Sequence, residues 1–417
     1  VFHPGDGSLG YNERLGDASI YQNGLSVHRH NDDFTYDYEI LSVITDSNYD
    51  ASQIGGDRGV NGSGGYPDQM WVGDIAEVLI FNSKVGESDR IIIHNYLSQK
   101  WGLTTSVDSD GDGVVDASDF APTDSNVQYD LTVDMTGKPS VLSDSSLKLW
   151  LDASHSNSVI KDGSNNVSNW LDLSGNGNNA VGQSFGNIPS FTSNGINGKS
   201  VISFNDGNNE SLKVDSSDLD FGGNDDFTYV VVYKSNTSSF DDGESAILSN
   251  RYSLDGYQLY VKRTNGQAVT FLGDNSNYVA VGTGAVHSMD DAQIVSATFD
   301  RSNEDKNKIY LNGIKKGETS LSAVGDSSMQ NSQVLEIGHE FNNRHTSKYF
   351  YEGDIAEILI FSKVLDSNEM VEINSYLATK WGLTSIVDSD GDGVADASDF
   401  APLDPTIQAD LTVDMTG

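Results

Sequence analysis

Short runs of apolar residues, many alternating with polar ones, recur along this chain, and clusters of Gly, Asn, Asp and Ser separate them. An alternation of period two is typical of β-strands, because successive side chains point to opposite faces of a sheet. Frequent turn residues between short strands favour an all-β sandwich or barrel. The expected strands are residues 200–204, 227–234, 257–263, 293–300, 308–311, 334–338 and 354–361.

One segment shows helical spacing instead. From Ser367 to Trp381, apolar residues recur every three or four positions and form one face. Ser367 is suited to cap this helix, and Gly382 is suited to end it. Residues 88–101 repeat the pattern earlier in the chain and predict a counterpart helix.

An acidic loop occurs twice in the chain. The first acidic loop runs from Asp108 to Asp119, and the second acidic loop runs from Asp388 to Asp399, 280 residues later. The register extends well beyond the loops, since residues 106–137 align with 386–417 without a gap and differ at only seven of 32 positions. Fixed-period self-similarity of this kind is the signature of a repeat protein.

The repeat predicts four segments. Residues 1–105 are the C-terminal half of a domain, 106–137 a calcium-binding linker, 138–385 a complete domain, and 386–417 a second linker. Half of a β-sandwich exposes one side of its core and leaves strand edges unpaired. The missing half is therefore expected either from a longer array from which this chain was cut or from another chain.

The acidic loops predict calcium binding. Carboxylates this close together repel one another unless a cation lies among them, and Ca²⁺ takes six to eight oxygen ligands at roughly 2.3–2.6 Å in flexible geometry. The pattern D-x-D-x-D-G supplies carboxylates from alternate positions, and the next residue offers its backbone carbonyl. The predicted ligands are Asp108, Asp110, Asp112, Val114, Asp116 and Asp119 in the first loop, and Asp388, Asp390, Asp392, Val394, Asp396 and Asp399 in the second.

Composition narrows the class of protein. The chain has 417 residues and a formal charge of −38, which disfavours nucleic acid and anionic membranes as partners. It has no cysteine, and no apolar run approaches the length of a membrane span. These features fit a bacterial extracellular protein stabilised by ions rather than by disulfides. Val1 is not an initiator Met, and we expect the chain to be a segment of a longer protein.

Several motifs in order carry a family resemblance. These are Leu147-Lys-Leu-Trp-Leu-Asp-Ala-Ser154, Asp172-Leu-Ser-Gly-Asn-Gly-Asn-Asn179, Gly353-Asp-Ile-Ala-Glu357 and Tyr376-Leu-Ala-Thr-Lys-Trp-Gly-Leu383. Together they resemble a bacterial laminin-G-like, concanavalin A-like domain, over about 147–385 in full and over 1–105 in its second half. The resemblance implies an antiparallel jelly-roll sandwich with one short helix per domain. It also implies binding of glycans or proteins, as in large extracellular adhesins or in accessory modules of carbohydrate-active enzymes.

The acidic loops resemble two calcium motifs, the EF-hand or dockerin loop and the thrombospondin type 3 repeat. The Phe-Ala-Pro that follows each loop favours the second. An EF-hand closes with Glu at position twelve, whereas Asp119 and Asp399 are shorter, and Pro122 and Pro402 prevent a second helix. The resemblance therefore implies a structural calcium site rather than a paired sensor. Asp124, Asp130 and Asp404 are candidates for a second ion.

No catalytic constellation is evident, and we expect no enzyme. Glycosidases of concanavalin A-like fold place paired carboxylates at positions i and i+2 or i+4 of a strand. Asp74 and Glu77, like Asp354 and Glu357, are three apart and are expected to make turn contacts and strand-edge hydrogen bonds. His28 and His30 are the only closely spaced histidines and form a weak candidate metal pair. Trp71 is a weak candidate for sugar stacking.

Two functions from different classes remain open. The first is a calcium-stabilised tandem-repeat segment of an extracellular structural or adhesive protein, such as a filament, sheath or surface adhesin, which binds neighbouring repeats or copies of itself. The second is a glycan-binding module of a secreted polysaccharide-degrading enzyme. Extracellular glycans or cell-surface proteins are the expected partners of an adhesin, and nucleic acid and membrane insertion are not expected. The acidic joint repeats more closely than the domains do, which favours the array.

Overall fold

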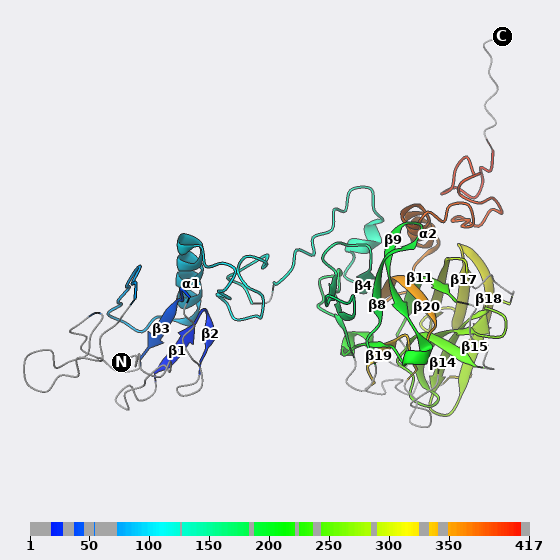
Figure 1. The fold of residues 1–417 in the computed structure, drawn as a ribbon. Coiled ribbons are helices and arrows are strands. Elements are labelled where there is room, and N and C mark those ends of the chain that lie inside the picture. The colour runs from blue at the N-terminus through cyan, green and yellow to red at the C-terminus, as the bar shows by residue number, and fades with distance from the viewer. Residues whose placement is uncertain are drawn as a thin grey trace, which may run out of the picture. The chain divides into compact units, whose positions relative to one another are not determined.

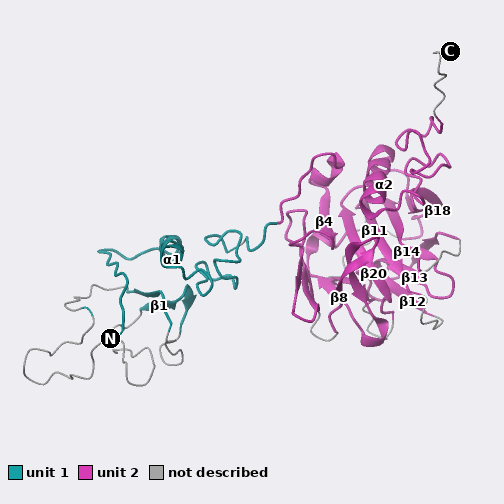
Figure 2. Ribbon diagram, turned by 45° about the horizontal axis from the view of Figure 1, so that its top comes forward, with its two compact units in different colours: residues 1–130 teal, residues 131–417 magenta. Residues whose placement is uncertain are grey.

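The computed structural model describes residues 18–27, 37–45, 54, 73–125, 127–182, 187–221, 225–236, 243–284, 290–324, 333–340 and 349–409. The chain divides into two compact units, unit 1 (Val1–Asp130) and unit 2 (Leu131–Gly417), which are described separately (Figure 2). The division falls inside the first predicted linker. Val133 and Met135, on its far side, pack against a hydrophobic core of unit 2.

Unit 2 is built almost entirely of β-strands (Figure 1). Its strands are β4 (Leu147–Asp152), β5 (Val159–Lys161), β6 (Val167–Trp170), β7 (Ala180–Gly182), β8 (Ser190–Ile196), β9 (Lys199–Phe204), β10 (Leu212–Val214), β11 (Phe227–Ser235), β12 (Glu244–Ser249), β13 (Asp255–Lys262), β14 (Ala268–Asp274), β15 (Tyr278–Gly282), β16 (Gln293–Asp300), β17 (Lys306–Leu311), β18 (Ile314–Ser320), β19 (Leu335–Ile337) and β20 (Gly353–Phe361). All seven expected strands are confirmed, with ends shifted by at most two residues.

The strands form two sheets that face each other as a sandwich. One sheet has nine strands in the order β15-β14-β13-β12-β19-β10-β7-β6-β5. The other has eight, in the order β18-β17-β16-β11-β20-β9-β8, with β4 also paired to β20. Neighbouring strands pair antiparallel, as the sequence predicted for a jelly roll.

Strand β11 shows how the apolar pattern builds two cores. Phe227, Tyr229 and Val231 point into the main core between the sheets. Val230 and Val232 point the other way, into a second core that helix α2 (Ser367–Trp381) covers. A strand buried on both faces is apolar at nearly every position, which explains its continuous apolar run.

Helix α2 is fixed at both ends. Its N-cap is Asp366, one residue before the expected Ser367, because the Asp366 carboxylate accepts hydrogen bonds from the Asn368 and Glu369 N–H groups, and Glu369 completes a capping box. Gly382 ends the helix in the left-handed conformation with φ 67°, as predicted.

Unit 1 contains fewer elements among its described residues. These are the small sheet β2-β1-β3, made of β1 (Ser19–Gln22), β2 (Leu25–Ser26) and β3 (Leu41–Ile44), and helix α1 (Glu87–Trp101). Helix α1 is the predicted counterpart helix and begins one residue earlier than expected.

Strand β3 pairs with β1 in unit 1, at the position where β16 pairs with β17 in unit 2. The Asn312 N–H donates to the Ile294 carbonyl at 2.8 Å, and the Ile294 N–H donates to Asn312 Oδ1 at 2.9 Å. In unit 1, Asn23 and Ile40 make the same two bonds at 2.8 and 2.9 Å. Ile294 precedes its hairpin in the sequence, whereas Ile40 follows its hairpin. The same edge of the hairpin therefore pairs with an earlier strand in unit 2 and with a later strand in unit 1.

The Asn-Gly turns also hold the acidic loops. The Asp108 N–H donates to the Asn23 carbonyl at 3.0 Å, and the Asp388 N–H donates to the Asn312 carbonyl at 3.1 Å. Gly313 has φ +87°, and a Cβ there would lie 1.8 Å from the Asp388 carbonyl oxygen. Only glycine allows this approach, so each acidic loop begins against the turn of a hairpin.

We expect Gly313→Ala to lower the free energy of unfolding of unit 2 by about 3 kcal/mol or more. A positive φ costs a residue with Cβ about 1–2 kcal/mol, and the contact with Asp388 adds strain. Urea unfolding at constant m-value measures the change. Gly175→Ala is the matched control, because Gly175 has φ +84° but no heavy atom within 4 Å of a built Cβ. Equal losses in the two variants would contradict the docking of the loop.

Candidate metal centre

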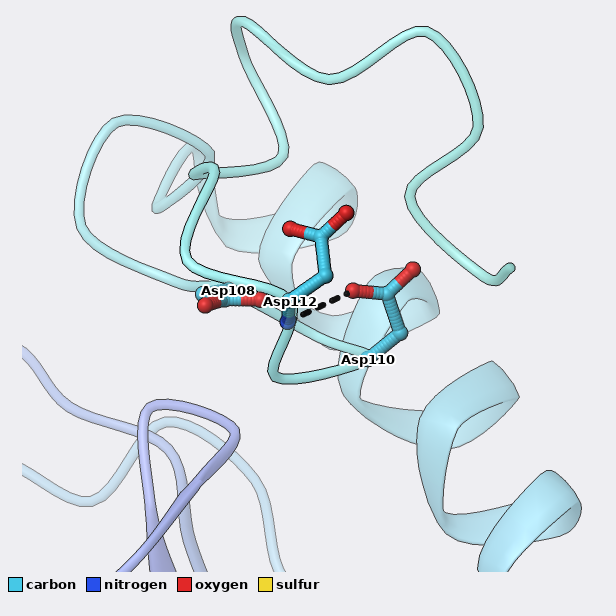
Figure 3. Close-up of side chains that lie close together, drawn as sticks. All are labelled: Asp108, Asp110 and Asp112. Carbon is cyan, nitrogen blue, oxygen red and sulfur yellow. Dashed lines mark hydrogen bonds between the residues drawn. The ribbon is translucent and has the colours of Figure 1, made fainter. Parts of the chain in front are cut away.

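Three carboxylates of each acidic loop lie together. One oxygen each from Asp108, Asp110 and Asp112 falls within 4.8 Å of the others, and Asp388, Asp390 and Asp392 make the same group (Figure 3 shows the first). Within the described ranges, these two are the only groups of three or more His, Cys, Asp or Glu side chains with this spacing.

Backbone N–H groups hold these carboxylates in place. Asp108 accepts from the N–H groups of Gly111 and Gly113 at 2.8 and 2.9 Å. Asp110 accepts from the Asp112 N–H at 3.3 Å (Figure 3), and Asp112 accepts from the Val114 N–H at 2.8 Å. The second loop repeats all four bonds within 0.1 Å. Short-range bonds of Asp side chains to the following backbone N–H groups fold each loop around its carboxylates.

One oxygen of each of three side chains in a loop remains without a partner. Oδ2 of Asp110, Asp112 and Asp119 is buried and accepts no hydrogen bond, and the same holds for Oδ2 of Asp390, Asp392 and Asp399. Asp110 is only 9% exposed. A buried carboxylate oxygen without a donor is costly, so six such atoms at equivalent positions are a signal for an absent cation.

The remaining predicted ligands have other contacts. Asp116 accepts the Ser109 N–H at 2.8 Å and the Ser109 hydroxyl at 2.9 Å, one on each oxygen. Asp396 binds Ser389 in the same way at 2.7 Å. These two side chains brace the loop, and their role as ligands stays a prediction. Val114 and Val394 each donate a backbone N–H into the loop, and their carbonyls remain predicted ligands.

The local electrostatics reflect the crowding of the carboxylates. Burial raises the pKa of Asp110 to about 6, and the charges of Asp112, Asp119 and Asp108 add to the effect. Burial also raises the pKa values of Asp112, Asp119 and Asp390. Asp119 is thus near enough to Asp110 for its charge to raise the Asp110 pKa.

A glutamine missed in the sequence supports each loop from outside. Gln128 Nε2 donates to the Asp112 carbonyl at 2.8 Å, and Gln408 Nε2 donates to the Asp392 carbonyl at 2.9 Å. Both glutamines stand at the same register of the repeat, which is the signal that could have identified them.

Glu357 has a different position from the one expected. It lies on the central strand β20, fully buried, and not at a strand edge. Its carboxylate accepts from Trp150 Nε1 at 2.8 Å, from Trp381 Nε1 at 2.7 Å and from Lys380 Nζ at 2.7 Å. Burial opposes the charge of Lys380, but Glu357 and Asp152 outweigh it and raise the Lys380 pKa above its ordinary value. The expectation of edge contacts was wrong for Glu357, because period-two reasoning cannot show which strand is central.

Asp354 and Asp404 make ordinary contacts. Asp354 accepts from the Ser203 hydroxyl at 2.6 Å, and Asp404 accepts from the Thr406 N–H and hydroxyl. A second ion near Asp124, Asp130 or Asp404 stays a prediction. His28, His30 and Trp71 lie outside the described residues.

The donor set of the loops fits a hard cation. It consists only of oxygen atoms, from carboxylates and backbone carbonyls, and a loop of glycines and aspartates leaves the coordination geometry adaptable. Asp108, Asp110, Asp112 and Asp119 would hold such an ion in the first loop. In the part of the chain that the structure describes, no helix is long and apolar enough to cross a membrane.

The chain is similar to several solved structures at low sequence identity. No curated protein matches the sequence. Among solved structures, the binding domain of Paraclostridial Mosquitocidal Protein 1 has 18% identity and a TM-score of 0.41 over 58% of this chain and 52% of that chain. The botulinum neurotoxin serotype G binding domain has 16% identity and a TM-score of 0.40 over 57% and 51%. The chain thus spans about half the length of these binding domains.

A third solved structure, the CBM40 of the Ruminococcus gnavus IT-sialidase, has 17% identity and a TM-score of 0.31 over 36% of this chain and 83% of that chain. The family model that matches the sequence is Laminin_G_3, of the concanavalin A-like lectin/glucanases superfamily, and it covers residues 206–370. These residues run from just after β9 into α2 and include β11 and β20. The family match therefore lies wholly within the β-sandwich of unit 2.

Proposed function

We propose that this chain is a non-catalytic, calcium-binding segment of an extracellular repeat protein with a structural or adhesive role. One observation carries the proposal. Each acidic loop gathers three aspartates whose Oδ2 atoms are buried without a hydrogen-bond partner, and the second copy repeats the arrangement at every position. Neighbouring repeats or copies of itself are the proposed partners.

Calcium suits this site better than magnesium does. Mg²⁺ demands near-ideal octahedral geometry and retains several waters, whereas Ca²⁺ accepts more ligands at longer and more variable distances. Four aspartate side chains in one short loop, together with a backbone carbonyl, supply more oxygens than a magnesium site usually takes from protein. A cation there also offsets the burial and the charge repulsion that together raise the Asp110 pKa.

The effect of the ion extends from the loop into the domain. Each loop begins on the Asn-Gly turn, and Val107 and Val387 just before it are fully buried. An ion that tightens the carboxylates therefore also fixes the chain against the hairpin. Such a device stiffens the joint between successive domains, as an extended array outside the cell requires.

We expect the chain to bind at least two calcium ions and to be stabilised by them. Calcium at a hundred times its Kd adds about 2.7 kcal/mol per site to the free energy of unfolding. Isothermal titration calorimetry of the chelated protein gives the stoichiometry. Asp110→Asn and Asp390→Asn should each remove one site. Asp162→Asn is the control, since Asp162 forms a similar turn with Ser164 and Asn166 away from the loops. Identical unfolding in calcium and in chelator would refute the proposal.

Calcium binding to the first loop should weaken in acid. An Asp110 pKa of about 6 means that a proton occupies this carboxylate at pH 5 and must leave before calcium binds. Folded Asp110 holds its proton more tightly than the unfolded residue does, so without calcium the loop loses stability as the pH rises from about 4 to 6, and calcium restores it. The affinity at pH 5 should be roughly tenfold lower than at pH 7.5, from one competing proton. Calorimetry on the Asp390→Asn variant isolates the first loop, and equal affinity at the two pH values would be the contrary result.

Glycan binding is a second candidate function, and one surface favours it. Tyr278 on strand β15 is 56% exposed and stacks on Phe271 with a centroid distance of 5.2 Å. The Arg251 guanidinium lies over the Phe271 ring, 4.1 Å from its centroid. An exposed aromatic ring that a second ring supports from below is a suitable platform for a sugar face.

If unit 2 binds glycans through this platform, Tyr278→Ala should abolish binding without unfolding the domain. A glycan array probed with the calcium-loaded chain measures it. Tyr38→Ala, at a similarly exposed tyrosine of unit 1, is the matched control. Binding that survives Tyr278→Ala would exclude the platform, and no binding by the native chain would leave the structural role as the proposal.

A further inference from the structure

One segment of unit 1 repeats the sequence of strand β20 of unit 2, but among the described residues it pairs with no strand. Residues 73–81 read Gly-Asp-Ile-Ala-Glu-Val-Leu-Ile-Phe and align with β20, which reads Gly-Asp-Ile-Ala-Glu-Ile-Leu-Ile-Phe. In unit 2, β20 pairs with β11 on one side and with β9 and β4 on the other. In the described part of unit 1, residues 73–81 belong to no strand. Ile80 is 77% exposed, whereas its counterpart Ile360 is 0% exposed.

The hydrogen bonds between this segment and the helix that follows it are nevertheless present in unit 1. Lys100 Nζ and Trp101 Nε1 of helix α1 both donate to Glu77 Oε2, each at 3.0 Å. Lys380 and Trp381 of helix α2 make the same two bonds to Glu357 at 2.7 Å. Unit 1 therefore keeps the contact that ties the helix to the strand.

In unit 2, strand β4 adds two further contacts to Glu357 and Lys380. Trp150 Nε1 donates to Glu357 Oε1 at 2.8 Å, and Asp152 Oδ2 accepts from Lys380 Nζ at 2.6 Å. In unit 1, Glu77 Oε1 accepts only from Lys100, and no described residue takes the place of Asp152. Trp101 is 45% exposed, whereas Trp381 is fully buried.

We propose that residues 73–81 and helix α1 form a receptor surface for a polypeptide segment with the chemistry of residues 138–289. Its strand equivalent to β4 would place a tryptophan against Glu77 and, two residues later, an aspartate against Lys100. The apolar residues of this segment would cover Val78, Leu79 and Ile80 as β4 and β11 cover β20. Charge complementarity selects this partner, because an apolar strand without the aspartate leaves the Lys100 ammonium with one carboxylate instead of two.

A second copy of the chain is a poor donor of this segment. In every copy, Leu149, Trp150 and Leu151 of β4 are buried in the cores of unit 2. Donating that strand would open a complete sandwich to close a half one. The occupant is therefore a further half-domain segment outside residues 1–417.

The test fuses a second copy of residues 138–289 ahead of Val1 in the full chain. Hydrogen exchange of the amides at 75–81 reports on strand pairing. We expect their protection to rise at least a hundredfold and the fluorescence of Trp101 to shift to the blue. Unchanged exchange at 75–81, with the β20 amides still protected as evidence that unit 2 is folded, would overturn the proposal.

Variants in the fused copy test the recognition itself. Trp150→Phe and Asp152→Asn, made only in the fused copy, should each lower the protection at 75–81 at least tenfold and leave β20 unchanged. Equal protection with these variants would show that any apolar strand suffices and would overturn the charge-complementary pairing. In the unfused chain, dimers by light scattering with protected amides at 75–81 would overturn the assignment in favour of a second copy.

Discussion

Strand β20 is the element on which the sandwich depends. It receives strands from early in the sequence, β4, β9 and β11, and helix α2 from directly after it. The buried carboxylate of Glu357 also links these elements, because it accepts hydrogen bonds from side chains of β4 and of α2. An unpaired buried charge costs several kcal/mol, so this centre is stable only when both halves of the sequence contribute. The unit therefore closes as a whole, through contacts between residues more than 200 positions apart.

Electrostatic repulsion imposes a second constraint, in the acidic loop that follows each helix. The chain carries 62 acidic and 24 basic residues, and it concentrates five aspartates in each acidic loop. Three kinds of contact hold the loop closed against that repulsion. The aspartates form turns with the following N–H groups, the loop begins on the Asn-Gly hairpin, and a glutamine side chain donates to a loop carbonyl. The residual cost appears as raised pKa values and as carboxylate oxygens without donors. A divalent cation is the simplest species that removes both.

Much of this could be predicted from the sequence, because local patterns decide it. Alternating and continuous apolar runs located the strands of unit 2, and an internal repeat located the acidic loops and both helices. The pattern could not show that Glu357 is central rather than at an edge, since the order of strands in a sheet depends on contacts far apart in the chain. The cap at Asp366 was missed by one residue, because Asp366 and Ser367 are both good caps and only Asp366 forms the capping box with Glu369. The fit of Gly313 against Asp388 was also beyond local reasoning, although the repeat of Asn-Gly before each loop hinted at it.

The first acidic loop belongs to one of the two units rather than to the segment that joins them. The first acidic loop lies wholly in unit 1 and is held by the hairpin of that unit, whereas Val133 and Met135, a short way beyond it, pack on unit 2. The clustered carboxylates and the hairpin that holds them thus all belong to unit 1. This arrangement explains why the acidic segment repeats more closely than the sheets do. The segment must fit a hairpin and bring several carboxylates together at once, whereas the outer faces of the sandwich carry no such combined constraint.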